Sequence, residues 1–256
     1  MKKYQKYFQN NEQLLAKLEE IHDKKYATKE LIESTNNNPF IVEISGLPRT
    51  GKSSSVIKIY DFFKKADINI VKTKEPAQII KDTMKKSEIS NMTGLEFNNK
   101  TLEISQKELI AKKNSHPSII LQDRGIIDNY FWYQMMYEEK KINETTYNKI
   151  LLNLYKDLLN IDQLFVLTAD KEIIVYRDYI NQIYLENRKK TTIERIEKLK
   201  QAYDNLLPTI ESHIPEGNLI YLDTSNINEI QTSIFIADKM MDGINEKYYT
   251  RKRTRI

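Results

Sequence analysis

Short apolar runs alternate with longer amphipathic stretches from residue 39 onward. Five runs are apolar nearly throughout and have the length of buried strands: residues 40–45, 68–73, 118–122, 163–168 and 218–223. Between them, apolar residues recur at helical spacing, which predicts helices starting near residue 53 and covering about 98–113, 126–138, 143–159, 171–184, 192–207 and 226–242. Strands joined by helical crossovers predict an α/β fold in three layers, with a five-stranded parallel sheet covered on both faces.

The same pattern suggests one main domain with additions at both ends. Residues 39–242 carry the alternating elements. Residues 1–38 show leucines at helical spacing and then an asparagine-rich break, which predicts a helical N-terminal extension and a linker. This extension packs either on the core or on a second subunit, so a homodimer is one of the arrangements we consider. Residues 243–256 are expected to form a basic C-terminal tail.

The charge distribution argues against nucleic-acid binding by the main domain, although binding through the basic C-terminal residues remains an alternative. The net charge is +4, and four basic residues lie among the last six, so residues 1–250 are neutral. A neutral core lacks the basic surface typical of polynucleotide binding. The basic end could touch phosphates, but a solvated terminus also explains it.

The remaining composition excludes several classes of site. Cysteine is absent, which excludes disulfides, thiolate metal sites and a cysteine nucleophile. The apolar runs are too short to span a bilayer, and the N-terminal residues lack the apolar core of a secretory signal. We therefore expect no membrane association and a cytoplasmic location.

The strongest motif is a phosphate-binding loop after the first predicted strand. Gly46-Leu-Pro-Arg-Thr-Gly51-Lys52-Ser53 has the form G-x-x-x-x-G-K-S, between an apolar strand and an amphipathic helix. Its backbone N–H groups and the helix N-terminus suit phosphate, Lys52 should reach the β- and γ-phosphates, and Ser53 should ligate Mg²⁺. ATP and Mg²⁺ are the expected cofactors, and the expected nucleotide contacts are Gly46, Arg49, Thr50, Gly51, Lys52, Ser53 and Ser54.

Acidic residues follow two other predicted strands. Glu75 follows the second strand, where ligands bind at the carboxyl edge of a parallel sheet, and it could accept a proton from an attacking hydroxyl; it could also be an ordinary loop residue. Asp123 ends the third strand and could hold Mg²⁺, while Arg124 could neutralise a phosphate; a strand-end salt bridge is the alternative.

Two further segments have a functional and a structural explanation. Aromatic residues from Tyr130 to Tyr133, including Trp132, could stack a base, although such a stripe on a helix is more often part of the core. Basic residues 188–190 could form part of a lid near 185–192 that closes over a triphosphate, or they could be a solvated charge run.

The order of these motifs resembles the P-loop nucleoside and nucleotide kinases. Thr73-Lys-Glu75-Pro76 is similar to the strand-end Thr-x-Glu-Pro of thymidylate and deoxynucleoside kinases, and Asp123-Arg124 to their Asp/Glu-Arg motif. The pattern is most similar to small predicted nucleotide kinases that include the ribosylnicotinamide kinase domain. Residues that fit this pattern, over a likeness covering about 40–224, are Glu75, Gln106, Asp123, Arg124, Gly125 and Asp128.

The resemblance implies a P-loop kinase fold and roles for individual residues. Glu75 would act as base toward the acceptor hydroxyl, and Arg188 would close with the lid. The expected catalytic residues are Lys52, Glu75, Asp123, Arg124 and Arg188, and the expected acceptor contacts are Glu75, Gln106, Asp128 and Trp132. Two departures weaken the case for a nucleoside monophosphate acceptor: Ala77-Gln78 replaces a Gly-Gly pair, and Gln106-Lys107 stands in place of an arginine.

Three functions therefore compete. The first is phosphoryl transfer from Mg·ATP to a hydroxyl or phosphate of a nucleoside-like small molecule. The second is a regulatory NTPase switch, which the absence of a guanine-binding Asn-Lys-x-Asp motif and of a strand ending in Asp-Glu disfavours. The third is a kinase acting on nucleic-acid ends, or as a toxin or defence component.

Overall fold

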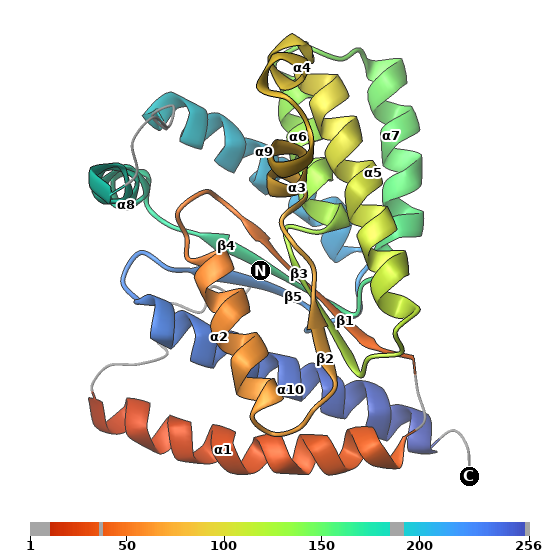
Figure 1. Cartoon of the computed structure of the whole chain (residues 1–256), viewed down its shortest axis with the longest axis vertical. Coiled ribbons are helices and arrows are strands. Elements are labelled where there is room, and N and C mark those ends of the chain that lie inside the picture. The colour runs from red at the N-terminus through yellow and green to blue at the C-terminus, as the bar shows by residue number, and fades with distance from the viewer. Residues whose placement is uncertain (1–10, 36–37, 185–191, 254–256) are drawn as a thin grey trace.

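Five parallel strands form one sheet in the order β2–β3–β1–β4–β5 (Figure 1). The structure is a computed structural model that describes residues 11–35, 38–184 and 192–253. The strands are β1 (Phe40–Gly46), β2 (Ile70–Lys72), β3 (Ile119–Asp123), β4 (Gln163–Thr168) and β5 (Leu219–Asp223). The predicted α/β fold class with a five-stranded parallel sheet is confirmed.

Helices cover both faces of this sheet. One face packs against α2 (Lys52–Lys64) and α10 (Glu229–Arg253), and α1 (Asn11–Ser34) packs on the outer side of α10. The other packs against α5 (Gly94–Lys113), α6 (Ile126–Glu138), α7 (Glu144–Leu158) and α9 (Ile193–Glu211), with Ile174 of α8 (Lys171–Tyr184) contributing. Two short helices, α3 (Pro76–Thr83) and α4 (Lys86–Asn91), connect β2 to α5.

Strand alternation divides the core between the two faces. Val42 and Ile44 of β1 pack in the cluster with α2 and α10, whereas Ile41 packs in the cluster with α6 and α9. All three side chains are at most 5% exposed. Because β1, β3 and β4 are buried along their whole length, they read as nearly continuous apolar runs in the sequence.

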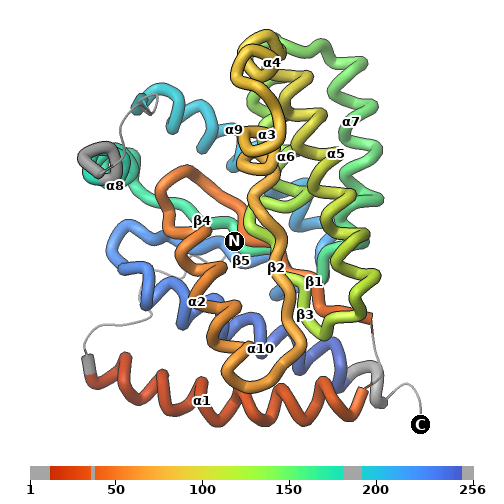
Figure 2. The backbone as a smooth tube through the Cα atoms, viewed as in Figure 1, coloured from red at the N-terminus to blue at the C-terminus, as the bar shows by residue number. Residues whose placement is uncertain are grey.

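The parallel arrangement brings the carboxyl ends of the strands to one edge. Residues Ile44 and Asp123 are register partners at the ends of β1 and β3, and Gly46 pairs with Leu167 near the end of β4. Figure 2 shows the turns that follow β1, β4 and β5 at the same end of the sheet. Side chains from several segments can therefore meet there.

Several predicted boundaries were wrong. The second strand is shorter than predicted, because only Ile70–Lys72 pairs with β3. Helices α3 and α4 were not predicted, since each is too short to show a clear helical period. The helix predicted over 192–207 continues through Pro208 to Glu211.

The C-terminal segment belongs to the packed domain rather than to a separate tail. Helix α10 continues from the predicted end at residue 242 to Arg253. Ile244 is 0% exposed and Tyr248 is 2% exposed. Lys247 Nζ also lies 2.7 Å from Asp162 Oδ2. These contacts explain why the helix continues: its inward face still carries large apolar residues.

The N-terminal helix packs on the core of its own chain. Ile21 and Leu31 of α1 belong to the same buried cluster as α10, and Lys24 Nζ lies 2.6 Å from Asp238 Oδ1. Of the two arrangements expected for this extension, the structure shows the first. No helix in the described ranges is both long enough and apolar enough to cross a membrane.

Candidate active site

The turn between β1 and α2 follows the phosphate-binding pattern, and two glycines permit its backbone path. Gly46 has a φ of 130°, and a Cβ there would lie 2.0 Å from the carbonyl oxygen of Leu167. Gly51 has a φ of 88° and immediately precedes α2. Residues with a Cβ rarely adopt such angles. The turn leads directly into the N-terminus of α2, where the helix dipole favours an anion.

The Lys52 side chain is buried inside this turn. Its Nζ donates to the carbonyl oxygen of Leu47 and, at 3.2 Å, to Oγ1 of Thr50. Burial lowers the pKa of Lys52 well below its usual value, and the positive charge of Arg124 adds to that effect. A phosphate anion bound in the turn would oppose this shift, because a nearby opposite charge favours the ammonium form.

An open cavity of about 1070 Å³ surrounds the phosphate-binding turn; we call it the donor cavity. The residues after β5 form another part of its wall. Gly46, also expected to contact nucleotide, is the last residue of β1. The expected nucleotide contacts that line the donor cavity are Arg49, Thr50, Gly51, Lys52, Ser53 and Ser54.

Arg177 joins the phosphate-binding turn to the segment after β5. It lies on α8 and lines the donor cavity. Its Nη1 donates to the carbonyl oxygen of Arg49 at 3.3 Å, and its Nη2 donates to that of Thr224 at 2.7 Å. Arg49 in turn donates from Nε to Asp178 Oδ1 at 2.7 Å. These bonds hold two walls of the donor cavity together.

Asp123 and Ser53 form the oxygen-rich part of the site. Burial raises the pKa of Asp123, against the opposing effects of a hydrogen bond from the Ser53 hydroxyl and the charge of Arg124. Asp123 is 8% exposed. Within the described part of the chain, its Oδ1 has no hydrogen-bond partner. A hydroxyl and a carboxylate with a spare oxygen suit a hard cation such as Mg²⁺.

Arg124 lies between two carboxylates. Its Nε lies 3.3 Å from Glu75 Oε1, and its Nη1 lies 3.1 Å from Asp128 Oδ2. The residue has a φ of 54°, an uncommon angle for a side chain with a Cβ. This turn directs the chain from β3 into α6, and the guanidinium lies between Glu75, which follows β2, and Asp128 in the first turn of α6.

Asp128 is the buried centre of a hydrogen-bond network. Its Oδ1 accepts from the Ser45 hydroxyl at 2.6 Å and the Tyr203 hydroxyl at 2.9 Å. Its Oδ2 accepts from Trp132 Nε1 at 3.2 Å. Burial alone would raise the pKa of Asp128, but Arg124 and the bond from Ser45 lower it overall. Asp128 therefore remains charged and holds the Arg124 guanidinium in place.

A second cavity of about 480 Å³ adjoins this network; we call it the acceptor cavity. Its polar end contains Glu75, Arg124 and Asp128. Glu75 and Arg124 also line the donor cavity, so the two cavities meet at this ion pair. The largest apolar side chains that line the acceptor cavity are Phe97, Trp132, Met135 and Met136.

Gln106 does not lie where the sequence analysis expected it. It does not line the acceptor cavity as the structure describes it; its Nε2 instead faces Asp157 Oδ2 at 3.4 Å. The physical reason is helical rotation, since Asn98 and Thr101 present the cavity-facing side of α5.

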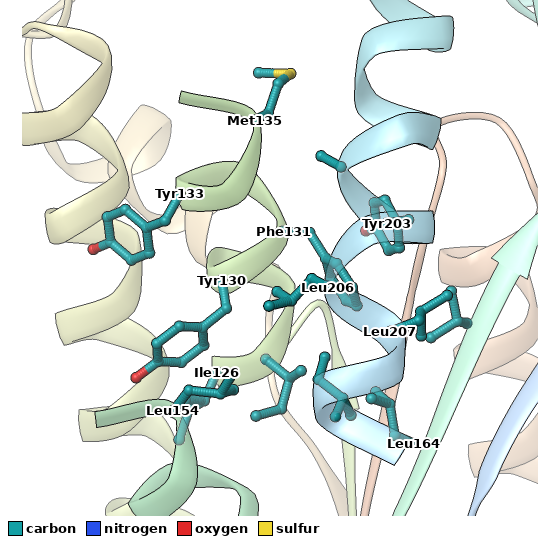
Figure 3. Close-up of a cluster of buried hydrophobic side chains, with 14 of the residues drawn as sticks. Ile126, Tyr130, Phe131, Tyr133, Met135, Leu154, Leu164, Tyr203, Leu206 and Leu207 are labelled. Carbon is teal, nitrogen blue, oxygen red and sulfur yellow. The ribbon is translucent and has the colours of Figure 1, made fainter. Parts of the chain in front are cut away.

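The aromatic run divides between the core and the acceptor cavity. Tyr130, Phe131 and Tyr133 are at most 2% exposed. Phe131 stacks on Tyr203 of α9 with ring centroids 3.7 Å apart, within the cluster shown in Figure 3. Trp132 lines the acceptor cavity. Only this member of the run has the position expected of an acceptor contact.

Other residues of the site lie outside the prediction. Arg195 lies in the first turn of α9, with its guanidinium carbon 5.7 Å from the centre of the Trp132 ring, and it lines the acceptor cavity. No motif singled it out. Glu43, described below, was hidden in an apolar strand. The proposed lid residue Arg188 lies outside the described residues.

Comparison with known proteins identifies the fold. No known protein family and no curated protein sequence matches the chain. Solved structures do match: deoxyadenosine kinase from M. mycoides with bound dATP has a TM-score of 0.53 at 17% identity, covering 78% of this chain and 98% of that one. A structure of the same kinase with the products dCMP and a flexible dCDP has a TM-score of 0.51 at 16% identity, covering 79% and 99%. The fold is therefore that of P-loop nucleoside kinases, as expected.

Proposed function

We propose that this protein transfers the γ-phosphoryl group of Mg·ATP to a hydroxyl of a nucleoside-like small molecule. The observation that carries this proposal is the meeting of the two cavities at Glu75 and Arg124. One cavity contains a phosphate-binding turn, and the other contains an apolar wall with a carboxylate at its inner end. A phosphotransferase needs both, with the reacting groups held in line at their junction.

The donor side fits a nucleoside triphosphate and Mg²⁺. Lys52 is buried in the turn and would contact the transferred phosphate. Ser53 and Asp123 would hold Mg²⁺, because both offer oxygen ligands and Asp123 Oδ1 has no hydrogen-bond partner among the residues described. When bound, Mg²⁺ would neutralise part of the negative charge of the phosphates.

The acceptor side fits activation of a hydroxyl. The Glu75 side chain is 36% exposed and lines both cavities, so it can orient an acceptor hydroxyl and take its proton. Arg124 is permanently charged and would stabilise negative charge that develops on the phosphoryl oxygens. Asp128 would keep that guanidinium in position through its 3.1 Å contact.

The apolar part of the acceptor cavity favours a planar ring. Phe97 and Trp132 offer aromatic surfaces, and Met135 offers an adaptable thioether. The fold neighbours support a nucleoside-like acceptor, because their structures hold dATP or dCMP. An NTPase switch would not need this second cavity, which supports the kinase over that alternative. Closure by Arg188 and a cytoplasmic location remain proposals from the sequence.

A screen of acceptors tests this function. The full chain would be incubated with Mg·ATP and single nucleosides, nucleoside monophosphates or ribosylnicotinamide, and products would be identified by mass. We expect a phosphorylated acceptor, formed at a rate that depends on acceptor concentration. ATP hydrolysis that no acceptor accelerates would contradict the proposal. Phosphorylation confined to polynucleotide ends would replace it with the nucleic-acid alternative.

A further inference from the structure

Glu43 is a fully buried carboxyl group in the middle of the sheet. It lies on β1, flanked by Val42 and Ile44, and is 0% exposed. Those two neighbours face α2 and α10, so strand alternation turns Glu43 toward α6. The aligned residue on β3, Gln122, is also 0% exposed. A carboxyl group in such a place has a large desolvation cost and needs specific partners.

The partners of Glu43 are N–H groups at the start of α6. Its Oε2 accepts from the backbone of Ile127 at 2.9 Å, and its Oε1 accepts from the backbone of Asp128 at 2.7 Å. The first N–H groups of a helix have no partner within the helix. The residue before α6 is Gly125, which has no side chain to cap them. Glu43 therefore caps α6 from the neighbouring strand.

Gly125 is part of the same arrangement. A Cβ at this position would lie 2.5 Å from Glu43 Oε2 and 2.7 Å from Gln122 Oε1. Any larger residue would push these side chains away from the helix. In the Asp123-Arg124-Gly125 motif at the end of β3, the third position therefore requires glycine for steric reasons, whereas the first two positions contribute charge.

We propose that Glu43 is a positioning residue of the phosphotransfer site: it anchors the N-terminus of α6 and so fixes Asp128 and, through Asp128, the Arg124 guanidinium. The contacts are continuous, since the backbone of Asp128 donates to Glu43 and its carboxylate accepts from Arg124 at 3.1 Å. The part of this inference that concerns catalysis rests on the proposed function. The anchoring itself does not.

The charge state of Glu43 gives the arrangement a measurable signature. Burial raises the pKa of Glu43 to about 8, and the nearby Asp128 carboxylate acts in the same direction, against the hydrogen bonds from the backbone of Ile127, Asp128 and Gly125. From β3 it faces the uncharged Gln122. The Asp128 carboxylate also accepts hydrogen bonds from Arg124 and from the Tyr203 hydroxyl. Ionisation of Glu43 thus places a second negative charge beside Asp128.

Trp132 reports on this network without any substrate. It is the one tryptophan in the chain, and its indole N–H donates to Asp128 Oδ2 at 3.2 Å. Its fluorescence emission would be followed from pH 6 to 10 in the full chain. We expect a transition with a midpoint near pH 8 in the wild type. We expect Glu43→Gln to abolish it and the exposed-site control Glu211→Gln to retain it.

Kinetics then link the anchor to the reaction. Once an acceptor is known, Glu43→Gln should lower kcat by about 10²-fold, the scale of a small misplacement of reacting groups, with the Kd for ATP unchanged. Glu43→Asp keeps the carboxyl group but shortens its reach, so it should retain a pH transition and still lose turnover. Circular dichroism would confirm that each variant is folded.

The outcomes separate this inference from the proposed function. If the wild type shows no fluorescence transition, or if a folded Glu43→Gln variant shows the same transition, the anchoring role of Glu43 would be overturned. Wild-type turnover in a folded Glu43→Gln would overturn its role in positioning. A transition that depends on Glu43, in a protein that phosphorylates no acceptor, would support the anchor and contradict the proposed function instead.

Discussion

The Glu75 carboxylate lies 3.3 Å from the Arg124 guanidinium, measured from Oε1 to Nε, at the boundary between the donor and acceptor cavities. Asp128 holds the same guanidinium from its other side. The candidate base and a permanent positive charge are therefore adjacent where an acceptor hydroxyl would meet the γ-phosphate.

Glu75→Gln should retain nucleotide binding and lose turnover. The substitution preserves size and removes the proton acceptor, so kcat should fall by about 10²–10⁴-fold, the usual contribution of a positioned general base. Calorimetry with Mg·ATP and steady-state kinetics on the identified acceptor would measure the two effects. Glu216→Gln, at an exposed position, is the control. Near wild-type turnover would make Glu75 an ordinary loop residue.

Lys52→Ala should abolish detectable phosphoryl transfer and leave the fold intact. Lys52 is the buried cation of the phosphate-binding turn, and its loss should cost more than the about 10²–10³-fold in kcat that follows removal of a single hydrogen-bond donor to a developing charge. Lys58→Ala, on the same helix but at a partly exposed ion pair with Glu229, should retain activity. Equal turnover of the Lys52 variant and the wild type would remove the turn from the mechanism.

Much of the fold could be predicted because the strands are apolar on both faces and the phosphate-binding turn needs glycines at fixed places. The parts of the fold that the sequence did not predict were two short helices and the end of the last helix. Helices α3 and α4 are too short for a periodic signal, and α10 extends to Arg253 because residues such as Tyr248 find a buried position. Neither feature depends on local sequence alone.

The site was predictable where a residue follows a strand and less so elsewhere. Glu75, Asp123 and Arg124 lie at strand ends, which parallel pairing brings to one edge. Gln106 was misplaced because its position on the face of α5 depends on how that helix is rotated against α6. Glu43 gave no signal, since its role requires the start of α6 to lie beside β1.

Tyr248→Ala should destabilise the protein strongly. The side chain is 2% exposed and lies within the segment that the sequence analysis separated as a tail. Truncation of a buried aromatic residue typically costs about 3–5 kcal/mol. Tyr249→Ala is a matched control, because the side chain of Tyr249 is 59% exposed. Urea unfolding of the wild type and the two variants would measure the difference, and equal midpoints would show that the buried Tyr248 side chain does not contribute to stability.

Glu43 should make the protein less stable as the pH rises through neutrality. Its pKa is raised from the usual 4.5 to about 8, so between these values the folded state retains a proton that the unfolded state has lost. Stability must then fall with increasing pH, by up to about 1.4 kcal/mol per unit. Glu43→Gln removes this contribution.

The pH slope of stability is therefore the quantity to compare. Free energies of unfolding for the wild type and Glu43→Gln, measured from pH 5 to 8, should diverge in favour of the variant as the pH rises. Parallel curves would mean that Glu43 does not retain its proton in the folded state. A steeper decline in the variant would contradict the direction of the shift.

Mass identification of the reaction products is the decisive measurement for phosphoryl transfer by this protein. Wild type, Lys52→Ala and Glu75→Gln would each be incubated with Mg·ATP and the nucleoside series. We predict one added phosphoryl group on an acceptor with the wild type, none detectable with Lys52→Ala, and greatly slowed formation with Glu75→Gln despite retained ATP binding. Release of ADP and free phosphate by the wild type, with every acceptor unchanged, would contradict it.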